Sequence, residues 1–242
     1  MFEEDRLEAK DLEWATFLYN AMGEDNAYIE DTSKVKRGIE NRAPGVAIVD
    51  FLNHWRMRVS TEKVPPEINE WYNNEGRMLL ASLPLSLSEI SMNDEKVIST
   101  IAELYNGLDR IQSINDTSVS KILHILCPVL FVMWDNEIRS YYLTVSEHKS
   151  GPKAYLHFLK RMQVLARSLL EQNKNISQDL SLKTKKLLEG NLRNFSNGSE
   201  LEKLKQMITF LADEGKPITK FLDEYNWIAH TKKVTIPPAW HP

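Results

Sequence analysis

One carboxylate in this sequence stands where it could do chemistry. Asp135 directly follows an apolar run, residues 129–134, that ends in Trp134. Such surroundings raise the pKa of a carboxyl group unless hydrogen-bond donors hold it ionised. A fixed carboxylate in a pocket of low dielectric constant can stabilise a positive charge that develops on a reacting group. Asp135 is therefore the candidate catalytic residue.

Two predicted helices and a tight turn precede this carboxylate. A short apolar stripe at helical spacing comes first, formed by Leu108, Ile111 and Ile114. The turn and cap residues Asn115-Asp116-Thr117 interrupt it. A second helix is expected after the turn and ends near Pro128, because proline disfavours a continuing helix. The apolar face of this second helix is formed by Val119, Ile122, Leu123 and Leu126.

This arrangement resembles the helix-hairpin-helix base-excision DNA glycosylases, as a divergent member. In that family a hairpin of the form L-P-G-V-G-x-K/S-T-A precedes an apolar segment that ends in the catalytic aspartate. Residues 111–117 lie over this hairpin without a gap, and the 18 positions from Thr117 to Asp135 match the family's spacing. The resemblance implies double-stranded DNA as the partner and Asp135 as the catalytic residue.

Three hairpin positions depart from the family's pattern. Ser113 and Asn115 stand where the family has glycines, which let backbone N–H groups approach a DNA phosphate closely. Asparagine can adopt a left-handed conformation, whereas serine is a poorer substitute for glycine. Thr117 stands where bifunctional members carry a Schiff-base lysine, and Lys121 lies one helical turn later. The resemblance therefore implies a monofunctional hydrolase of damaged or mispaired bases.

The resemblance also suggests which other residues contact the DNA. The candidate DNA-binding residues of the hairpin are Ser113, Asn115, Thr117, Ser118 and Lys121. Trp134 and Arg139 are candidates for a base pocket or a phosphate contact. A pocket is required because the target nucleotide must leave the stack before its glycosidic bond is cleaved.

Each of these roles has a purely structural alternative. Asp135 followed by residues 136–138 is typical of a helix start, where the carboxylate accepts backbone N–H groups. Arg139 would then pair with Asp135 at the i,i+4 spacing. The hairpin would be a simple turn between helices. In that case the chain is an inactive relative that binds DNA or protein, or an all-α interaction protein with no nucleic-acid role.

The composition is that of an ordinary globular protein, with 42% hydrophobic and 26% charged residues. No run reaches the roughly 18 apolar residues that a membrane helix needs. The acidic N-terminus lacks the apolar region of a signal peptide, which predicts a cytoplasmic protein.

A single cysteine, Cys127, excludes a disulfide framework within the chain. The six histidines are scattered, so neither a metal nor another cofactor is expected. The oligomeric state stays open.

Charge is distributed unevenly along the chain, whose net charge is −4. Residues 1–109 have a net charge of −10, residues 110–174 of +4 and residues 175–242 of +2. A basic middle segment could face DNA. Ordinary solvated helix faces are the alternative explanation.

Apolar periodicity predicts an all-α fold of about ten helices over residues 1–242. The helices are expected to form two lobes, with Asp135 near their cleft and the helix-hairpin-helix segment over residues 108–142. The other predicted helices cover residues 1–22, 46–59, 66–82, 94–106, 153–172, 179–189, 199–213 and 217–229.

Three local features are expected around these helices. Residues 24–34 are expected to be irregular and to end in a helix cap. Arg56 and Arg58 are expected to stabilise the C-terminal carbonyls of the helix over 46–59 through its dipole. Gly107 is expected to end the helix that precedes the hairpin.

Overall fold

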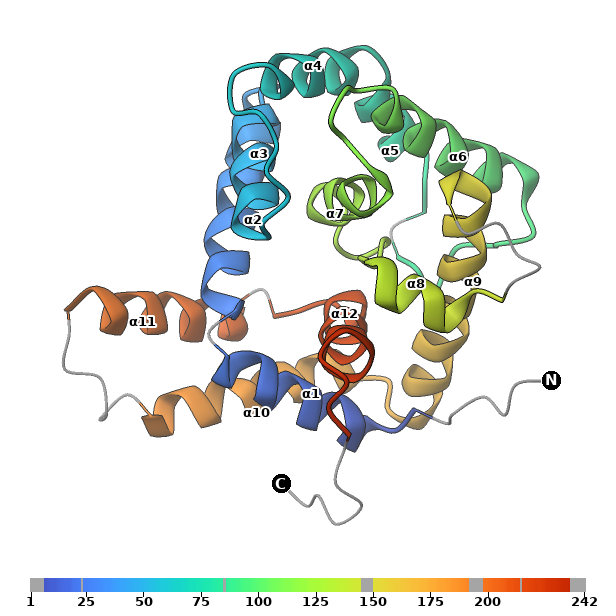
Figure 1. Ribbon diagram of the computed structural model, residues 1–242. Coiled ribbons are helices and arrows are strands. Elements are labelled where there is room, and N and C mark those ends of the chain that lie inside the picture. Colours follow the sequence, from blue (N-terminus) through green and yellow to red (C-terminus); the bar gives the residue numbers. More distant parts are fainter. Residues whose placement is uncertain are drawn as a thin grey trace. The chain divides into compact units, whose positions relative to one another are not determined.

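The structure is a computed structural model that describes residues 7–22, 24–84, 86–144, 150–191, 198–213 and 215–235. Every regular element in these ranges is a helix, which confirms the expected all-α fold (Figure 1). The chain divides into two compact units. The terminal unit comprises residues 1–29 and 164–242, and the central unit comprises residues 30–163.

The central unit is built around α7. Its elements are α3 (Gly45–His54), α4 (Val64–Trp71), the π-helical turn η1 (Tyr72–Gly76), α5 (Arg77–Ala81), α6 (Glu95–Asp109), α7 (Asp116–Leu126) and α8 (Asn136–Tyr142), with parts of α2 (Glu24–Glu40) and α9 (Gly151–Gln172). Helix α7 packs against both α3 and α6 (Figure 1). Its predicted apolar residues Val119, Ile122 and Leu123 are fully buried as a result.

The terminal unit is organised around α1 (Ala9–Ala21). This helix packs against α12 (Ile218–Asn226), the π-helical turn η3 (Trp227–Thr231) and α10 (Ile176–Asn191). Helix α10 in turn packs against α11 (Gly198–Asp213). Leu12 and Tyr19 of α1 and Phe221 of α12 are fully buried, so these helices share an apolar core.

The expectation of irregular structure over residues 24–34 is wrong, because α2 continues from Glu24 to Glu40. Asp31 had the residue type of a helix cap. Its side chain is instead fully buried, with Oδ2 2.7 Å from Nδ1 of His54. A tertiary contact therefore uses the carboxylate that sequence alone assigned to a helix end.

The helix predicted over residues 46–59 ends early, at His54. Arg56 and Arg58 follow it with left-handed φ angles of 60° and 55°. The two arginines are thus loop residues, and their predicted role at the helix C-terminus is wrong.

Gly107 does not end α6, which continues to Asp109. A Cβ atom at Gly107 would lie 2.3 Å from Nε1 of Trp71. Gly76 contacts the other side of the same indole, where a Cβ atom would lie 2.8 Å from Cη2. Gly107 is therefore required by close packing against Trp71 and not by helix termination.

Replacing Gly107 with alanine is expected to lower the free energy of unfolding by about 2–3 kcal/mol, because the added methyl group overpacks the site. Chemical denaturation followed by circular dichroism measures this loss. Gly190→Ala is the matched control, because Gly190 is helical and nothing lies within 4 Å of the position its Cβ would take. The control should be stabilised by about 0.5–1 kcal/mol. Equal effects of both substitutions would contradict the packing argument.

Candidate functional site

The hairpin between α6 and α7 consists of residues 110–115. The side chains of Ile111 and Ile114 are buried and anchor it to the core, whereas Gln112 and Ser113 are exposed. The N–H of Ile114 donates to the carbonyl of Ile111 at 3.1 Å, which closes a tight turn. Ser113 has a φ of 75°, in the left-handed region that favours glycine. Asn115, the other residue considered for a left-handed conformation, is extended instead, with a φ of −110°.

The N-terminus of α7 begins directly after this turn. Asn115 caps the helix, because its Oδ1 accepts the N–H of Ser118 at 2.9 Å. Among the residues that the structure describes, no hydrogen bond involves the N–H groups of Gln112, Ser113 or Asn115. These donors lie where the positive end of the α7 dipole is concentrated. The exposed side of the hairpin can therefore receive an anion.

The first residue of α7, Asp116, is held inward by three donors. Its carboxylate accepts the hydroxyl of Tyr105 from α6, Nη1 of Arg139 from α8 at 2.8 Å and the N–H of Gly151 at 3.0 Å. Burial and the adjacent carboxylate raise the pKa of Tyr105 far above its usual value, so its hydroxyl remains a donor at physiological pH. Because Arg139 neutralises it, Asp116 does not leave an uncompensated negative charge beside the hairpin.

Two polar side chains and one backbone carbonyl of α7 hold the apolar approach to Asp135. The N–H of Trp134 donates to Oγ of Ser120 at 3.2 Å, and its indole Nε1 donates to the carbonyl of Asp116 at 3.0 Å. Nδ1 of His124 donates to the carbonyl of Phe131 at 2.7 Å. A segment without regular structure is thereby fixed along α7, and the position of Asp135 follows from it.

Trp134 is a core residue of the central unit. Its side chain is 1% exposed, and its ring centroid lies 5.0 Å from that of Tyr155 and 5.4 Å from that of Phe158. A stacking surface for an extruded base would need an accessible ring face. The predicted pocket role of Trp134 is therefore corrected to a packing role.

Asp135 is half-buried and caps α8, since its Oδ1 accepts the N–H of Ile138 at 2.9 Å. The cap that the sequence allowed is thus present. Arg139 pairs with Asp116 and donates to Oδ1 of Asn136, so the guanidinium binds other partners than the predicted i,i+4 carboxylate. The structure brings Arg139 and the hairpin together through Asp116.

The predicted hairpin residues divide into two groups. Ser113 and Asn115 are exposed and Thr117 is half-buried, so these three can be reached from solvent. Ser118 and Lys121 are buried, and Nζ of Lys121 lies 4.4 Å from the ring centroid of Trp55. The prediction that the side chains of Ser118 and Lys121 contact DNA is therefore corrected, because both side chains are buried in the protein.

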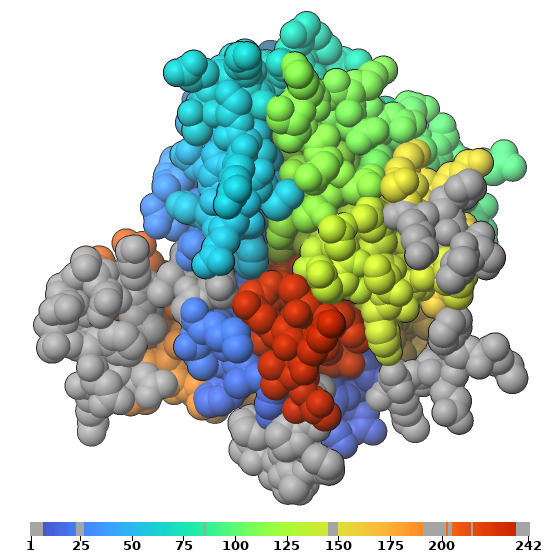
Figure 2. Space-filling model, in the orientation of Figure 1, coloured from blue at the N-terminus to red at the C-terminus, as the bar shows by residue number. Residues whose placement is uncertain are grey.

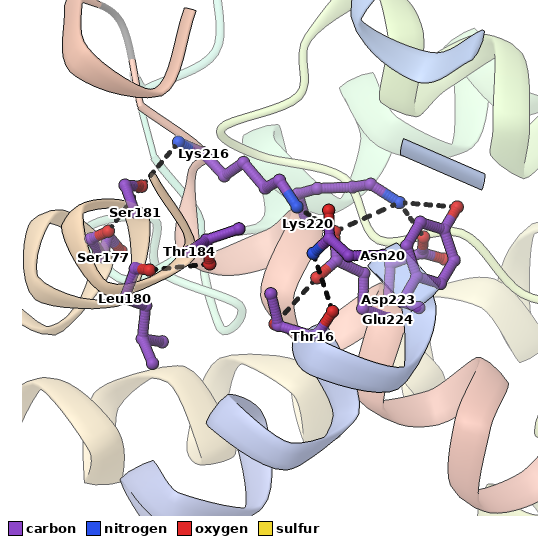
Figure 3. A network of polar contacts seen from close by, with 11 residues as sticks. Thr16, Asn20, Ser177, Leu180, Ser181, Thr184, Lys216, Lys220, Asp223 and Glu224 are labelled. Atoms are coloured by element: carbon purple, nitrogen blue, oxygen red, sulfur yellow. Dashed lines mark hydrogen bonds and ion pairs between the residues drawn. The ribbon is translucent and has the colours of Figure 1, made fainter. Parts of the chain in front are cut away.

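Sequence reasoning missed a buried charge cluster in the terminal unit (Figure 3). Nζ of Lys216 lies 2.8 Å from Oε1 of Glu224, and the other carboxylate oxygen accepts the Thr16 hydroxyl at 2.8 Å. Nζ of Lys220 lies 2.9 Å from Asp223 and 3.7 Å from Glu224, and it donates to the Tyr19 hydroxyl at 3.1 Å. Both lysine side chains are fully buried. Lys220, Asp223 and Glu224 lie at helical spacing on the helix predicted over residues 217–229, and Lys216 directly precedes that helix. This spacing could have indicated the cluster.

The described residues contain no group of three or more histidine, cysteine, aspartate or glutamate side chains that could hold a metal ion. Burial raises the pKa of the Cys127 thiol to about 11, which makes it a poor metal ligand at neutral pH. Within the same ranges, no helix combines the length and apolarity needed to cross a membrane.

Substituting Ser113 tests the hairpin backbone. Ser113→Gly is expected to raise the free energy of unfolding by about 0.5–1 kcal/mol. The left-handed conformation costs a non-glycine residue ~1–2 kcal/mol, while glycine loses an extra ~0.5–1 kcal/mol of backbone freedom. Ser113→Ala should have little effect, because alanine bears the same strain. Urea denaturation distinguishes the two, and equal stability of the glycine and alanine variants would disprove the strained conformation.

Removing one partner of the buried cluster tests its contribution to stability. Glu224→Ala should lower the free energy of unfolding by about 3–5 kcal/mol, because it leaves the lysine charge buried and uncompensated. The control is Glu189→Ala, whose side chain is 42% exposed and pairs with Lys185 at 3.2 Å within α10. An exposed pair of this kind contributes at most about 1 kcal/mol. A loss at Glu224 as small as that at Glu189 would mean that the cluster is hydrated.

Comparison of the sequence with models of known protein families gives no match, and neither do the comparisons with curated proteins and with solved structures. The function of this chain is therefore inferred from its own residues and their geometry.

Proposed function

We propose that this protein binds double-stranded DNA through the hairpin and the first turn of α7, residues 110–117. The left-handed backbone at Ser113 is the observation that carries the proposal. Ser113 stands at one of the two hairpin positions where the resembled family has glycine, the residue that adopts this conformation most readily. N–H groups of exposed residues that make no hydrogen bond among the described residues, together with the positive end of a helix dipole, form an arrangement that accepts phosphate.

Two further features favour an anion over a merely structural turn. Ile111 and Ile114 anchor the hairpin from within, so its outer side is available to a partner. The carboxylate of Asp116, which directly follows the hairpin, pairs with Arg139 and accepts the hydroxyl of Tyr105. Contacts of this kind position a duplex and carry no base specificity.

The proposal extends to hydrolysis of the N-glycosidic bond of a damaged or mispaired base. The bond between C1′ and the base nitrogen would break with its electron pair on the base, and water would add to C1′. Asp135 would stabilise the positive charge on the sugar and accept the proton of the attacking water. It is half-exposed at the end of a buried approach, which suits this role. The burial of Lys121 over Trp55 favours a monofunctional reaction, since its amine is not presented as a nucleophile.

Binding is tested by placing a carboxylate on the hairpin. Ser113→Glu is expected to weaken duplex binding at least tenfold in a fluorescence-anisotropy titration at low salt, because it repels a phosphate. Ser91→Glu is the matched control, because Ser91 is exposed before the start of α6, the end of that helix away from the hairpin. Equal affinities of both variants would contradict binding at the hairpin, and a wild-type protein that binds no duplex would contradict the function itself.

Hydrolysis is tested by Asp135→Asn. Asparagine caps a helix about as well as aspartate, so the fold of α8 should persist while the charge is lost. Single-turnover assays on duplexes with uracil, 8-oxoguanine, hypoxanthine or alkylated bases should show base release by the wild type and none by the variant. Duplex binding without release on any of these lesions would restrict the protein to binding.

A further inference from the structure

The loop that follows α3, residues 55–58, is held in a fixed conformation. The side chain of Asn53 clamps its base, because Nδ2 donates to the carbonyl of Val59 at 3.0 Å and Oδ1 accepts the N–H of Val59 at 2.7 Å. Inside the loop, the N–H of Met57 donates to the carbonyl of Leu52 at 3.1 Å. The loop is therefore preorganised.

Side chains alternate along this loop. Arg56 and Arg58 are exposed, whereas Trp55 and Met57 are half-buried. Both arginines have left-handed φ angles, although no glycine is present to relieve the conformation. Among the contacts of the described residues, no ion pair or hydrogen bond involves either guanidinium group. The loop thus presents two exposed cations that form no ion pair or hydrogen bond within the described part of the central unit.

The loop lies beside the helix that carries the hairpin. Lys121 of α7 stacks on Trp55 with its ammonium 4.4 Å from the ring centroid, and α3 packs against α7. In Figure 2 the cyan atoms of this part of the chain border the green atoms of α7. Lys121 is one helical turn beyond Thr117, so the arginines and the hairpin both flank the N-terminal half of α7.

We propose that Arg56 and Arg58 form a second phosphate-binding site for the duplex that binds the hairpin. The inference rests on the proposed DNA binding. Guanidinium groups donate paired hydrogen bonds to phosphate oxygens, and a preorganised loop loses little conformational freedom on binding. The loop exposes no fully accessible aromatic ring, so it contacts the backbone of the duplex and does not stack on bases.

The test measures duplex affinity as a function of salt concentration for the full chain. The double variant Arg56→Gly/Arg58→Gly should fold normally, because glycine adopts positive φ angles without strain. Its slope of log K against log salt concentration should fall in magnitude by about 1.8, since each lost phosphate contact removes about 0.9. Duplex affinity at 0.1 M salt should be roughly tenfold to a hundredfold lower, because the two lines converge near 1 M salt. Arg56→Lys/Arg58→Lys should retain the slope.

The control Lys96→Gln/Lys174→Gln removes the same charge from exposed lysines, one at the start of α6 and one before α10. Its slope should equal that of the wild type. If the wild type binds duplex and the glycine variant keeps the wild-type slope, the second site is wrong while binding at the hairpin stands. If control and glycine variant lose the same slope, the effect is one of net charge and the inference fails. Absence of duplex binding by the wild type would overturn both proposals.

Discussion

The Asp116 carboxylate is the interaction on which the central unit depends. It lies at the first position of α7 and accepts hydrogen bonds from α6, α8 and the start of α9, through Tyr105, Arg139 and Gly151. The carbonyl of the same residue holds the indole of Trp134. One residue therefore fixes the hairpin, the apolar approach and the helix that Asp135 caps. Because its charge is compensated on the inner side, the outer side of the hairpin is left to its backbone donors.

The terminal unit also depends on buried charge, but in a different form. Lys216 and Lys220 place two ammonium groups against Asp223 and Glu224 in a region without solvent access. Removing charges from water costs several kcal/mol per ion, so such a cluster adds little net stability. The cluster does fix how α1 lies along α12, because Thr16 of α1 donates to Glu224 and Tyr19 of α1 accepts from Lys220. The cluster therefore joins α1 to α12 through hydrogen bonds that the apolar core alone would not make.

Much of this structure could be predicted from apolar spacing and cap residues. The α7 face, the cap at Asp135 and the all-α class follow from local pattern, because helices bury a periodic stripe. The roles of Gly107 and Asp31 could not be predicted, because each depends on a residue distant in sequence, Trp71 or His54. A left-handed backbone conformation is unfavourable for serine, so it was not expected at Ser113. The turn there depends on the burial of Ile111 and Ile114, which the serine side chain does not indicate. The burial of Trp134 likewise depends on α9, which lies later in the chain.

The most direct test of DNA binding by the hairpin is an NMR titration of the isotope-labelled protein with a short duplex. Binding at the hairpin predicts that the largest amide shifts fall on Gln112, Ser113 and residues 115–117, with smaller shifts on Arg56 and Arg58, and that they diminish as salt is added. Shifts that are absent at low salt, or that fall elsewhere and leave the hairpin amides unchanged, would contradict it.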